Sequence, residues 1–305
     1  MRHTILCGNL FFGIAILALS AVLLAAGSAF IQIWFYSFAW WSTILILDSL
    51  NYRIGGSSVL SRLPKNFLGL AFLSVPVWLV FELYNLVLKN WSYHQLPQER
   101  EIRWLGYFIA FATVIPALLE LADLWKNLLA KRLKPGPRLK LTGIRLTFLT
   151  AAGGISLLLP LLVPHAAFPL VWLGFIFFLD PINFRKGRDS LFGDLSRGNW
   201  LRLWSWVLAG LTAGFLWEFF NFWAGSHWQY SLPFFEFGKI FQMPVLGYFG
   251  FAPFALEIFV FLALYRHVRD RLRNRTWAAP IIFLILLIFD GLVFYLIDTF
   301  TWVKG

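Results

Sequence analysis

The residues of this chain that are best suited to chemistry are carboxylic acids placed inside long apolar runs. Four glutamates have this setting, namely Glu82, Glu120, Glu218 and Glu257. An ionised carboxylate at the centre of a bilayer costs roughly 2.5 to 3.5 kcal/mol, so an acid there is a functional candidate by default. A buried carboxylic acid that stays neutral can protonate a substrate, and its conjugate base can take a proton back. These four residues are therefore the candidate catalytic acids or bases.

An asparagine accompanies the first acid of each pair. Asn85 follows Glu82 by three residues, and Asn221 follows Glu218 by three. Residues three apart share a helix face, so each glutamate and its asparagine should point into the protein together. Their carboxyl and amide groups can bind each other or hold a polar ligand. The open alternative is that they form interhelical hydrogen bonds, which stabilise a membrane bundle without doing chemistry.

These acids belong to a pattern that occurs twice in the chain. Residues 79–120 and 215–257 carry the same landmarks in the same order: Glu, Asn, Trp-x-Tyr, Leu-Pro, Gly-Tyr, and a Pro followed four residues later by Glu. Most of these landmarks are polar, so shared hydrophobicity does not explain the match, and we predict an internal repeat. The last Glu follows its Gly by 14 residues in the first copy and by 10 in the second. This difference of about one helical turn keeps the acid on its face but changes its depth, so the two halves can differ in role.

A polar motif precedes each copy, LDSLNYRIGGSSVL at 47–60 and LDPINFRKGRDSLF at 179–192. Its Asp, Asn and Arg side chains could bind a phosphate or a lipid headgroup, with a tight turn at Gly55 and Gly187. They could also cap helix ends, and the absence of a glycine-rich phosphate loop favours capping. The candidate ligand-binding residues are Asp48, Asn51, Arg53, Asp180, Asn183 and Arg185, together with Asn85 and Asn221.

The composition is that of a polytopic membrane protein. The 305 residues are 59% hydrophobic, 19% aromatic and only 13% charged, whereas soluble domains are roughly 25% charged. The first apolar run is longer than the core of a signal peptide, so we expect a retained first helix. With about 20 apolar residues per crossing, the fold class is an all-α transmembrane bundle. Its nine helices are expected near residues 5–26, 30–49, 66–88, 103–125, 144–163, 166–180, 200–224, 245–265 and 278–299.

The predicted helices divide into two units and one extra helix. Residues 1–130 form the first four-helix repeat, 131–143 a basic linker broken by Pro-Gly-Pro, 144–270 the second repeat, and 271–305 an additional transmembrane helix. An even number of helices makes the repeats parallel, related by an axis along the membrane normal. Of the 26 Lys and Arg residues, 21 then fall on the side of the N-terminus and five on the other. The positive-inside rule predicts an inner-membrane protein with a cytoplasmic N-terminus and an outer C-terminus.

Several other classes of function are disfavoured. The net charge of +11 does not indicate nucleic-acid binding, because the basic residues lie in short loops where they set topology. The single cysteine, Cys7, rules out a Cys-based metal cluster, and none of the five histidines lies well inside a predicted helix. We therefore expect no metal and no cofactor. The repeated Trp-x-Tyr is expected to lie in the outer aromatic belt.

The order of an acid, a Trp-x-Tyr, a Gly-containing turn and a Pro-to-Glu segment in a Phe-rich helix resembles the repeat unit of the small integral-membrane lycopene cyclases of carotenoid biosynthesis. In the second half it reads Glu218, Trp228-Gln-Tyr230, Gly247 and PFALEIFVF from position 253. That family has two homologous halves, and its membrane acids are thought to protonate a polyene end. It carries Pro-x-Glu-Glu where this chain has Pro-x-x-x-Glu. The resemblance implies a lipid or isoprenoid substrate.

Three functions stay open at this point. The first is a membrane enzyme acting on an isoprenoid or lipid by acid–base chemistry. The second is a proton-coupled transporter or carrier that uses the same acids as relay sites. The third is a non-catalytic membrane subunit of a larger complex, with another membrane protein as its partner.

Overall fold

The computed structural model describes residues 2–64, 66–234 and 237–304. In this part of the chain nine segments are long and apolar enough to cross a membrane. The predicted all-α polytopic bundle is thereby confirmed, with each crossing close to its expected place. The segments are Gly8–Ala25, Ala29–Gly55, Phe67–Leu88, Arg100–Leu129, Gly143–Leu162, Pro164–Arg185, Leu201–Trp223, Val245–Leu272 and Ala278–Phe300.

The first half of the chain begins with two paired helices and includes one strand. Its second helix extends past the expected end at residue 49, to a C-cap at Gly56 with φ of 72°. This left-handed conformation favours glycine, so the turn lies at Gly56 and not at Gly55 as predicted. The elements are α1 (Arg2–Ala25), α2 (Ala29–Gly55), α3 (Val59–Arg62), α4 (Phe67–Leu88), β1 (Trp91–His94), α5 (Arg100–Phe111) and α6 (Val114–Leu129).

One expected crossing, 103–125, is built from two helices, α5 and α6. Where they meet, the Ser74 hydroxyl of α4 donates to the Phe111 carbonyl at 2.5 Å and accepts from the Ile115 N–H at 3.0 Å. Backbone groups freed by a helix break inside a membrane must be bound by protein, and this buried serine binds two of them. The break depends on a residue of another helix, so the local sequence did not reveal it.

The second half packs its helices closely through glycines. A Cβ added at Gly153 of α7 would lie 2.2 Å from the Phe178 N of α9, and one at Gly210 of α11 would lie 2.2 Å from the Phe251 O of α12. Small residues of this kind let membrane helices approach each other. The elements are α7 (Gly143–Leu162), α8 (Pro164–Ala167), η1 (Phe168–Leu170), α9 (Val171–Arg185), α10 (Leu191–Ser196), α11 (Leu201–Trp223), β2 (His227–Tyr230), β3 (Lys239–Ile240), β4 (Met243–Pro244), η2 (Val245–Gly250), α12 (Phe251–Leu272) and α13 (Ala278–Phe300).

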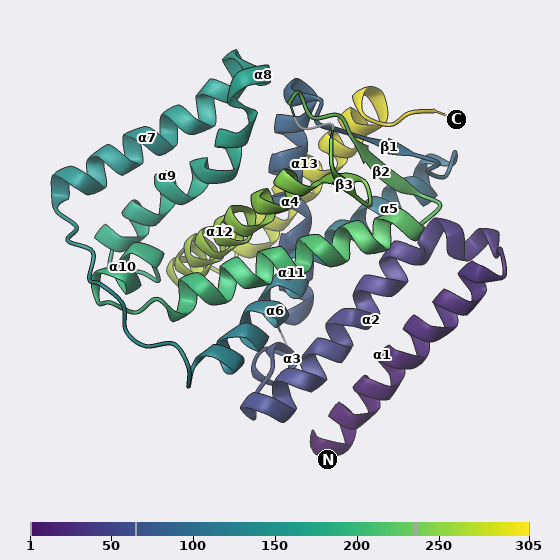
Figure 1. Ribbon diagram of the computed structural model, residues 1–305, viewed down its shortest axis with the longest axis horizontal. Helices are drawn as coiled ribbons and strands as arrows, with labels where there is room; N and C mark the ends of the chain where they lie inside the picture. Colours follow the sequence, from purple (N-terminus) through teal and green to yellow (C-terminus); the bar gives the residue numbers. More distant parts are fainter. Residues whose placement is uncertain (1, 65, 235–236, 305) are drawn as a thin grey trace.

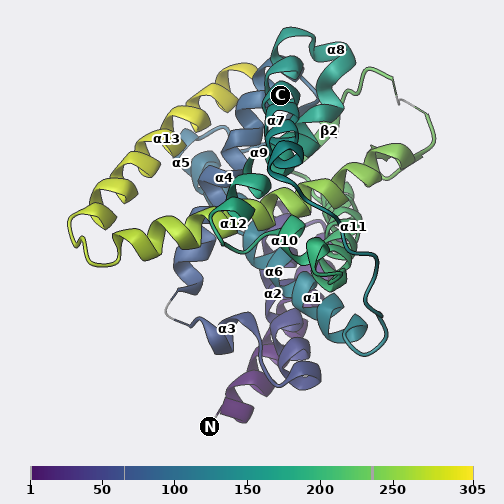
Figure 2. The same ribbon diagram turned by 90° about the vertical axis from the view of Figure 1, so that its left-hand side faces the viewer.

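The two halves lie side by side and meet along α6 and α11. The paired helices α1 and α2 form one flank and α7 and α9 the other, with the N- and C-termini at opposite ends of the bundle (Figure 1). Helix α13 packs against α4, and Figure 2 shows it returning from the α12–α13 turn towards the end that carries the C-terminus. The division into two repeats and a linker remains a prediction.

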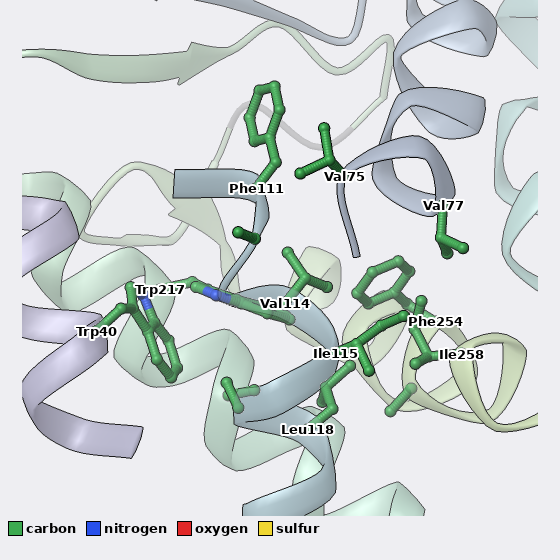
Figure 3. Packing of buried hydrophobic residues seen from close by; sticks show 14 of the residues in the cluster. Trp40, Val75, Val77, Phe111, Val114, Ile115, Leu118, Trp217, Phe254 and Ile258 are labelled. Atoms are coloured by element: carbon green, nitrogen blue, oxygen red, sulfur yellow. The ribbon is translucent and has the colours of Figure 1, made fainter. Parts of the chain in front are cut away.

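The buried core lies between α2, α4, α6, α11 and α12. Figure 3 shows the Trp40 and Trp217 rings side by side, with centroids 5.6 Å apart. It also shows Phe254 of α12 next to Ile115 of α6 and Ile258. Large aromatic side chains from both halves therefore fill the region that positions the candidate site.

Candidate functional site

A short two-stranded ribbon closes one end of the bundle and joins the two halves. Strands β1 and β2 pair in antiparallel fashion, with Trp91 opposite Tyr230 and Tyr93 opposite Trp228. In each of these pairs, the Trp of one copy lies opposite the Tyr of the other copy. The two copies therefore make equivalent contributions to the ribbon.

An asparagine at the end of each preceding helix holds its strand. The Asn85 Nδ2 donates to the Trp91 O at 2.8 Å, and its Oδ1 accepts from the Asn90 N at 2.9 Å and the Trp91 N at 3.1 Å. The Asn221 Nδ2 donates to the Trp228 O at 2.9 Å, and its Oδ1 accepts from the Trp228 N at 2.8 Å. An amide suits this position because it carries both an acceptor and a donor. Both asparagines point inward as predicted, but they bind the backbone of the ribbon.

The glutamate one turn before each asparagine binds the tyrosine of its own strand. The Glu82 Oε1 accepts from the Tyr93 hydroxyl at 2.5 Å and from the indole N–H groups of Trp78 and Trp91 at 2.9 and 3.1 Å. The Glu218 Oε1 accepts from the Tyr230 hydroxyl at 2.9 Å. These contacts lie within one half of the chain, so neither glutamate bridges the two halves.

The second oxygen of each carboxyl is the unusual one. Both glutamate side chains are fully buried, and the Oε2 atoms of Glu82 and Glu218 have no hydrogen-bond partner among the described residues. Buried polar atoms are nearly always paired, so an unpaired carboxyl oxygen is a functional signal.

The two tyrosines are held as protonated phenols. Burial raises the pKa of Tyr93 well above its usual value, and the nearby Glu82 raises it further. Burial likewise raises the pKa of Tyr230, with Glu218 adding to the effect. Each hydroxyl therefore acts as a hydrogen-bond donor and can pass a proton on without first ionising.

A cavity of ≈ 440 Å³ lies against the inner face of the ribbon. Small-molecule sites usually measure roughly 300 to 1,000 Å³, so this space is large enough for an organic ligand. The wall is mostly apolar, is rich in aromatic residues and comes from both halves. It includes Trp78, Trp91, Tyr93, Phe111, Trp217, Trp228, Tyr230 and Phe254.

The tyrosines, not the glutamates, face this cavity. Among the described residues that line it are Tyr93 and Tyr230, whereas Glu82 and Glu218 lie behind them at hydrogen-bond distance. Each pair therefore links a buried carboxyl group to the cavity through a phenol. We call these two units the Glu–Tyr pairs.

The first Trp-x-Tyr copy does not have the exposed side chains of an aromatic belt. The side chains of Trp91 and Tyr93 are only 6% exposed, and both line the cavity. Asn85 binds the backbone N–H and carbonyl of Trp91. These hydrogen bonds fix the strand so that its Trp and Tyr side chains point into the bundle. The signal that could have identified the tyrosines was their position 11 or 12 residues after an intramembrane acid in the two copies.

The cavity reaches the apolar side of the bundle beside η2. Three residues of its wall, Leu173, Leu246 and Phe249, are 37%, 50% and 65% exposed. In the layout predicted from the sequence this side faces lipid. An apolar molecule in the bilayer could therefore enter the cavity laterally, without crossing water.

Helix α13 fixes Tyr93 from the other side. The Tyr93 N donates to the Thr301 O and the Val303 N donates to the Tyr93 O, both at 2.8 Å. One turn of α13 earlier, the Asp298 carboxylate binds the Arg103 guanidinium at 2.7 and 2.6 Å. The extra helix therefore positions one of the two Glu–Tyr pairs. Among the described contacts, no corresponding segment binds the backbone of Tyr230 in β2.

The other two candidate acids lie away from the cavity. The Glu120 Oε2 accepts from the Asn51 Nδ2 at 2.7 Å, whereas the Glu257 Oε1 accepts from the Phe175 N at 3.1 Å. Asn51 also reaches the Glu120 carbonyl, and its counterpart Asn183 reaches the Val260 carbonyl. The position equivalent to Glu120 is therefore occupied by Val260, and Glu257 lies about one turn earlier on α12.

The polar motifs at the helix ends behave mainly as caps. The Asp48 Oδ1 accepts from the Leu60 N at 2.8 Å, at the start of α3. Asp180 accepts from the N–H groups of Leu191 at 2.9 Å and Phe192 at 2.7 Å, at the start of α10. A carboxylate in this place binds the free N–H groups of a helix N-terminus.

The arginine of the second motif binds the start of another helix. The Arg185 guanidinium donates to the Gly143 O at 2.7 Å and the Thr147 Oγ1 at 2.5 Å, both at the start of α7, and Arg53 is exposed. In the second half, the Asp, Asn and Arg side chains of the motif therefore do not converge on one anion.

Comparison of the chain with known protein families, with curated proteins and with solved structures finds no match. The assignment of function therefore depends on the site itself.

Proposed function

We propose that this protein is an integral membrane enzyme that binds a lipid or isoprenoid in the cavity under the ribbon and acts on it by acid–base chemistry through the two Glu–Tyr pairs. The observation that carries the proposal is the position of the Tyr93 and Tyr230 hydroxyls. Both line one apolar cavity, and each is hydrogen-bonded to a fully buried glutamate.

The chemistry of the cavity favours an apolar ligand with a reactive double bond. Its aromatic walls offer dispersion contacts and negatively charged ring faces, which stabilise a developing carbocation. Its polar lining includes the two tyrosines of the pairs, together with Arg103 and His227. A pocket that is apolar apart from a few convergent polar groups is the usual form of a small-molecule site.

A proton relay accounts for the arrangement of each pair. For the relay the hydrogen bond of the pair reverses, so that the protonated Glu82 carboxyl group donates to the Tyr93 oxygen and the Tyr93 hydroxyl points into the cavity. Glu82 then transfers its proton to the Tyr93 oxygen while the Tyr93 proton moves to an alkene carbon, forming a C–H bond and leaving a carbocation and a carboxylate. Loss of a different proton from the cation to Tyr93, with transfer of the phenol proton back to Glu82, regenerates a double bond and the starting state of the pair. The net reaction is an isomerisation or cyclisation that consumes no oxidant or reductant.

The resemblance to the membrane lycopene cyclases supports an isoprenoid as the substrate class, because the shared landmarks contain Glu218, Trp228 and Tyr230. Each half contributes one strand of the ribbon and one Glu–Tyr pair. This duplication supports two related halves arranged around one site. The proposal includes an inner-membrane location with a cytoplasmic N-terminus, supported by the distribution of 21 against five basic residues.

Deuterium incorporation tests the chemistry whatever the substrate is. The full-length protein would be purified in mild detergent, its retained lipids incubated in D₂O, and their non-exchangeable deuterium measured by mass spectrometry. We expect wild type to place deuterium on carbon of one isoprenoid or lipid. Removal of a general acid typically lowers a rate by about 10² to 10⁴-fold, so Glu82→Gln and Glu218→Gln should slow incorporation to this extent.

Two further variants separate binding from chemistry. Tyr93→Phe removes only a hydroxyl group, so it should retain the lipid but lose incorporation. Ala110→Phe fills the cavity, which Ala110 lines, so it should lose the lipid itself. Retention of the same bulk phospholipids by wild type and Ala110→Phe, with no deuterium on carbon in either, would refute the proposal.

A further inference from the structure

A second buried polar cluster lies in the first half, apart from the cavity. It consists of Asp48 and Asn51 of α2 and Glu120 of α6, and all three side chains are 0% exposed. The Asn51 Nδ2 donates to the Glu120 Oε2 at 2.7 Å. Asp48 lies three residues before Asn51 on α2 and therefore on the same helix face, so two acids and an amide gather where α2 packs against α6.

Each residue of this cluster contributes one oxygen that has no donor. Within the described part of the chain, the Asp48 Oδ2, the Asn51 Oδ1 and the Glu120 Oε1 are buried without a hydrogen-bond partner. The remaining carboxyl oxygens are bound, the Asp48 Oδ1 by the Leu60 N and the Glu120 Oε2 by Asn51. Three unpartnered oxygens in one place form an acceptor set that lacks a positive group.

Among the described residues, no lysine or arginine donates a hydrogen bond to these three oxygens. Asp123, one turn farther along α6, is bound by Arg62 of α3. The acids of the other packed helices, Glu82 on α4 and Glu218 on α11, bind tyrosines near the opposite ends of those helices. Two facing carboxylates repel each other, and burial increases the cost unless a cation binds between them.

The second half has a matching aspartate without this feature. Both oxygens of Asp180 have donors, the Leu191 N for Oδ1 and the Ser190 hydroxyl and Phe192 N for Oδ2. Val260 stands where the first half has Glu120, as the contact from Asn183 shows. Helix capping alone therefore accounts for Asp180 but not for the acid pair.

We propose that Asp48, Asn51 and Glu120 bind one monovalent cation, a proton or Na⁺, between the two carboxyl groups. Both ions compete for the same kind of carboxyl and amide oxygens, and Na⁺ and proton sites of membrane proteins use such groups. The site is distinct from the Glu–Tyr pairs, and it does not depend on the enzymatic proposal.

Thermal unfolding of the full-length protein in detergent micelles tests the site. The midpoint would be measured from pH 5 to pH 9 in NaCl and in choline chloride of equal ionic strength. A bound proton makes wild type less stable as the pH rises in choline chloride, because the folded protein holds a proton that the unfolded chain releases. A bound Na⁺ raises the midpoint by a few degrees in NaCl over choline chloride. Either result identifies the ion, and it supports the site when the cluster variants lose it.

Amide variants connect the effect to the cluster. Asp48→Asn and Glu120→Gln each remove one charge, so the Na⁺ dependence, or the loss of stability with rising pH that belongs to the cluster, should be absent in both. Asp180→Asn is the matched control, since it should lose stability through its capping bonds but retain the cation dependence of wild type. A wild-type midpoint that responds to neither ion, or a response that survives in both cluster variants, would overturn the proposal.

An infrared measurement on wild type covers the case in which the cluster variants do not fold. A protonated carboxyl group has a C=O stretch separate from that of a carboxylate, and we expect a band of this kind to titrate with pH or to change when Na⁺ replaces choline. A spectrum unchanged by both ions would contradict the site.

Discussion

Replacement of Asn85 by alanine should destabilise the protein more than almost any other change to a polar side chain near the ribbon. The side chain is fully buried, and its amide makes three hydrogen bonds to the backbone of Asn90 and Trp91. Each such bond contributes about 0.5 to 1.5 kcal/mol to stability. The Asn85→Ala variant should therefore lower the free energy of unfolding by about 3 kcal/mol, since two N–H groups and one carbonyl lose their partner.

The corresponding change in the second half provides an internal scale. Asn221 makes two bonds, both to Trp228, so Asn221→Ala should cost about 2 kcal/mol by the same reasoning. Unfolding in mixed micelles with increasing SDS, followed by the fluorescence of the 16 tryptophans, measures both values.

Asn66 is the matched control for this pair of variants. It is exposed, and its side chain makes no capping bond at the start of α4. Asn66→Ala should change stability by no more than about 0.5 kcal/mol. If Asn85→Ala and Asn66→Ala have the same effect, the asparagine does not hold the ribbon, and the account of how Trp91 is positioned is wrong.

Three further predictions concern other parts of the fold. Asp298→Asn breaks a nearly buried ion pair with Arg103, so it should cost about 3 kcal/mol in the same unfolding assay. Burial, and then His227, lower the pKa of His94, so the unfolded chain takes up this proton first and thermal stability should fall as the pH drops below about 6.5. His227→Gln should make that fall shallower, because it removes the second of these causes. Gly210→Ala should destabilise by about 1 to 3 kcal/mol, because its Cβ would collide with the backbone of α12.

Each of these has a contrasting change. Asp270→Asn removes an exposed pair with Arg269 and should have almost no effect, so equal losses for Asp298→Asn and Asp270→Asn would contradict the role of α13. A His227→Gln variant whose stability follows pH as steeply as wild type would contradict the coupling of the two histidines. Gly69→Ala adds a Cβ with no atom within 4 Å, so it should not destabilise the protein by a steric clash. If Gly210→Ala has the same effect on stability as Gly69→Ala, then α11 and α12 do not pack as closely as described.

The crossings could be predicted because each one is a local property of the chain. A membrane helix must bind its own backbone polar groups, so length and hydrophobicity suffice to locate it. The exceptions depend on other elements. The break between α5 and α6 is stabilised by Ser74 of α4, and the extension of α2 ends at the left-handed turn of Gly56.

The candidate site could be predicted only in part. The spacing of Glu82 and Asn85 correctly placed both side chains on a buried face, because helical periodicity alone decides it. It did not reveal their partners. Tyr93 was assigned to the membrane interface, where tyrosines are common, and the predicted equivalence of Glu120 and Glu257 did not show that only Glu120 faces a second acid.

The sequence by itself determined the kind of protein, the positions of its helices and the identity of its buried acids, since these follow from hydrophobicity and from the spacing of residues along one chain. Only the tertiary structure decided what those acids do. The pairing of β1 with β2 brings residues more than a hundred positions apart into one ribbon, places two tyrosines over one cavity, and puts a glutamate behind each. Which oxygen meets a donor depends on the packing of several helices at once, and that packing is not a local property of the sequence.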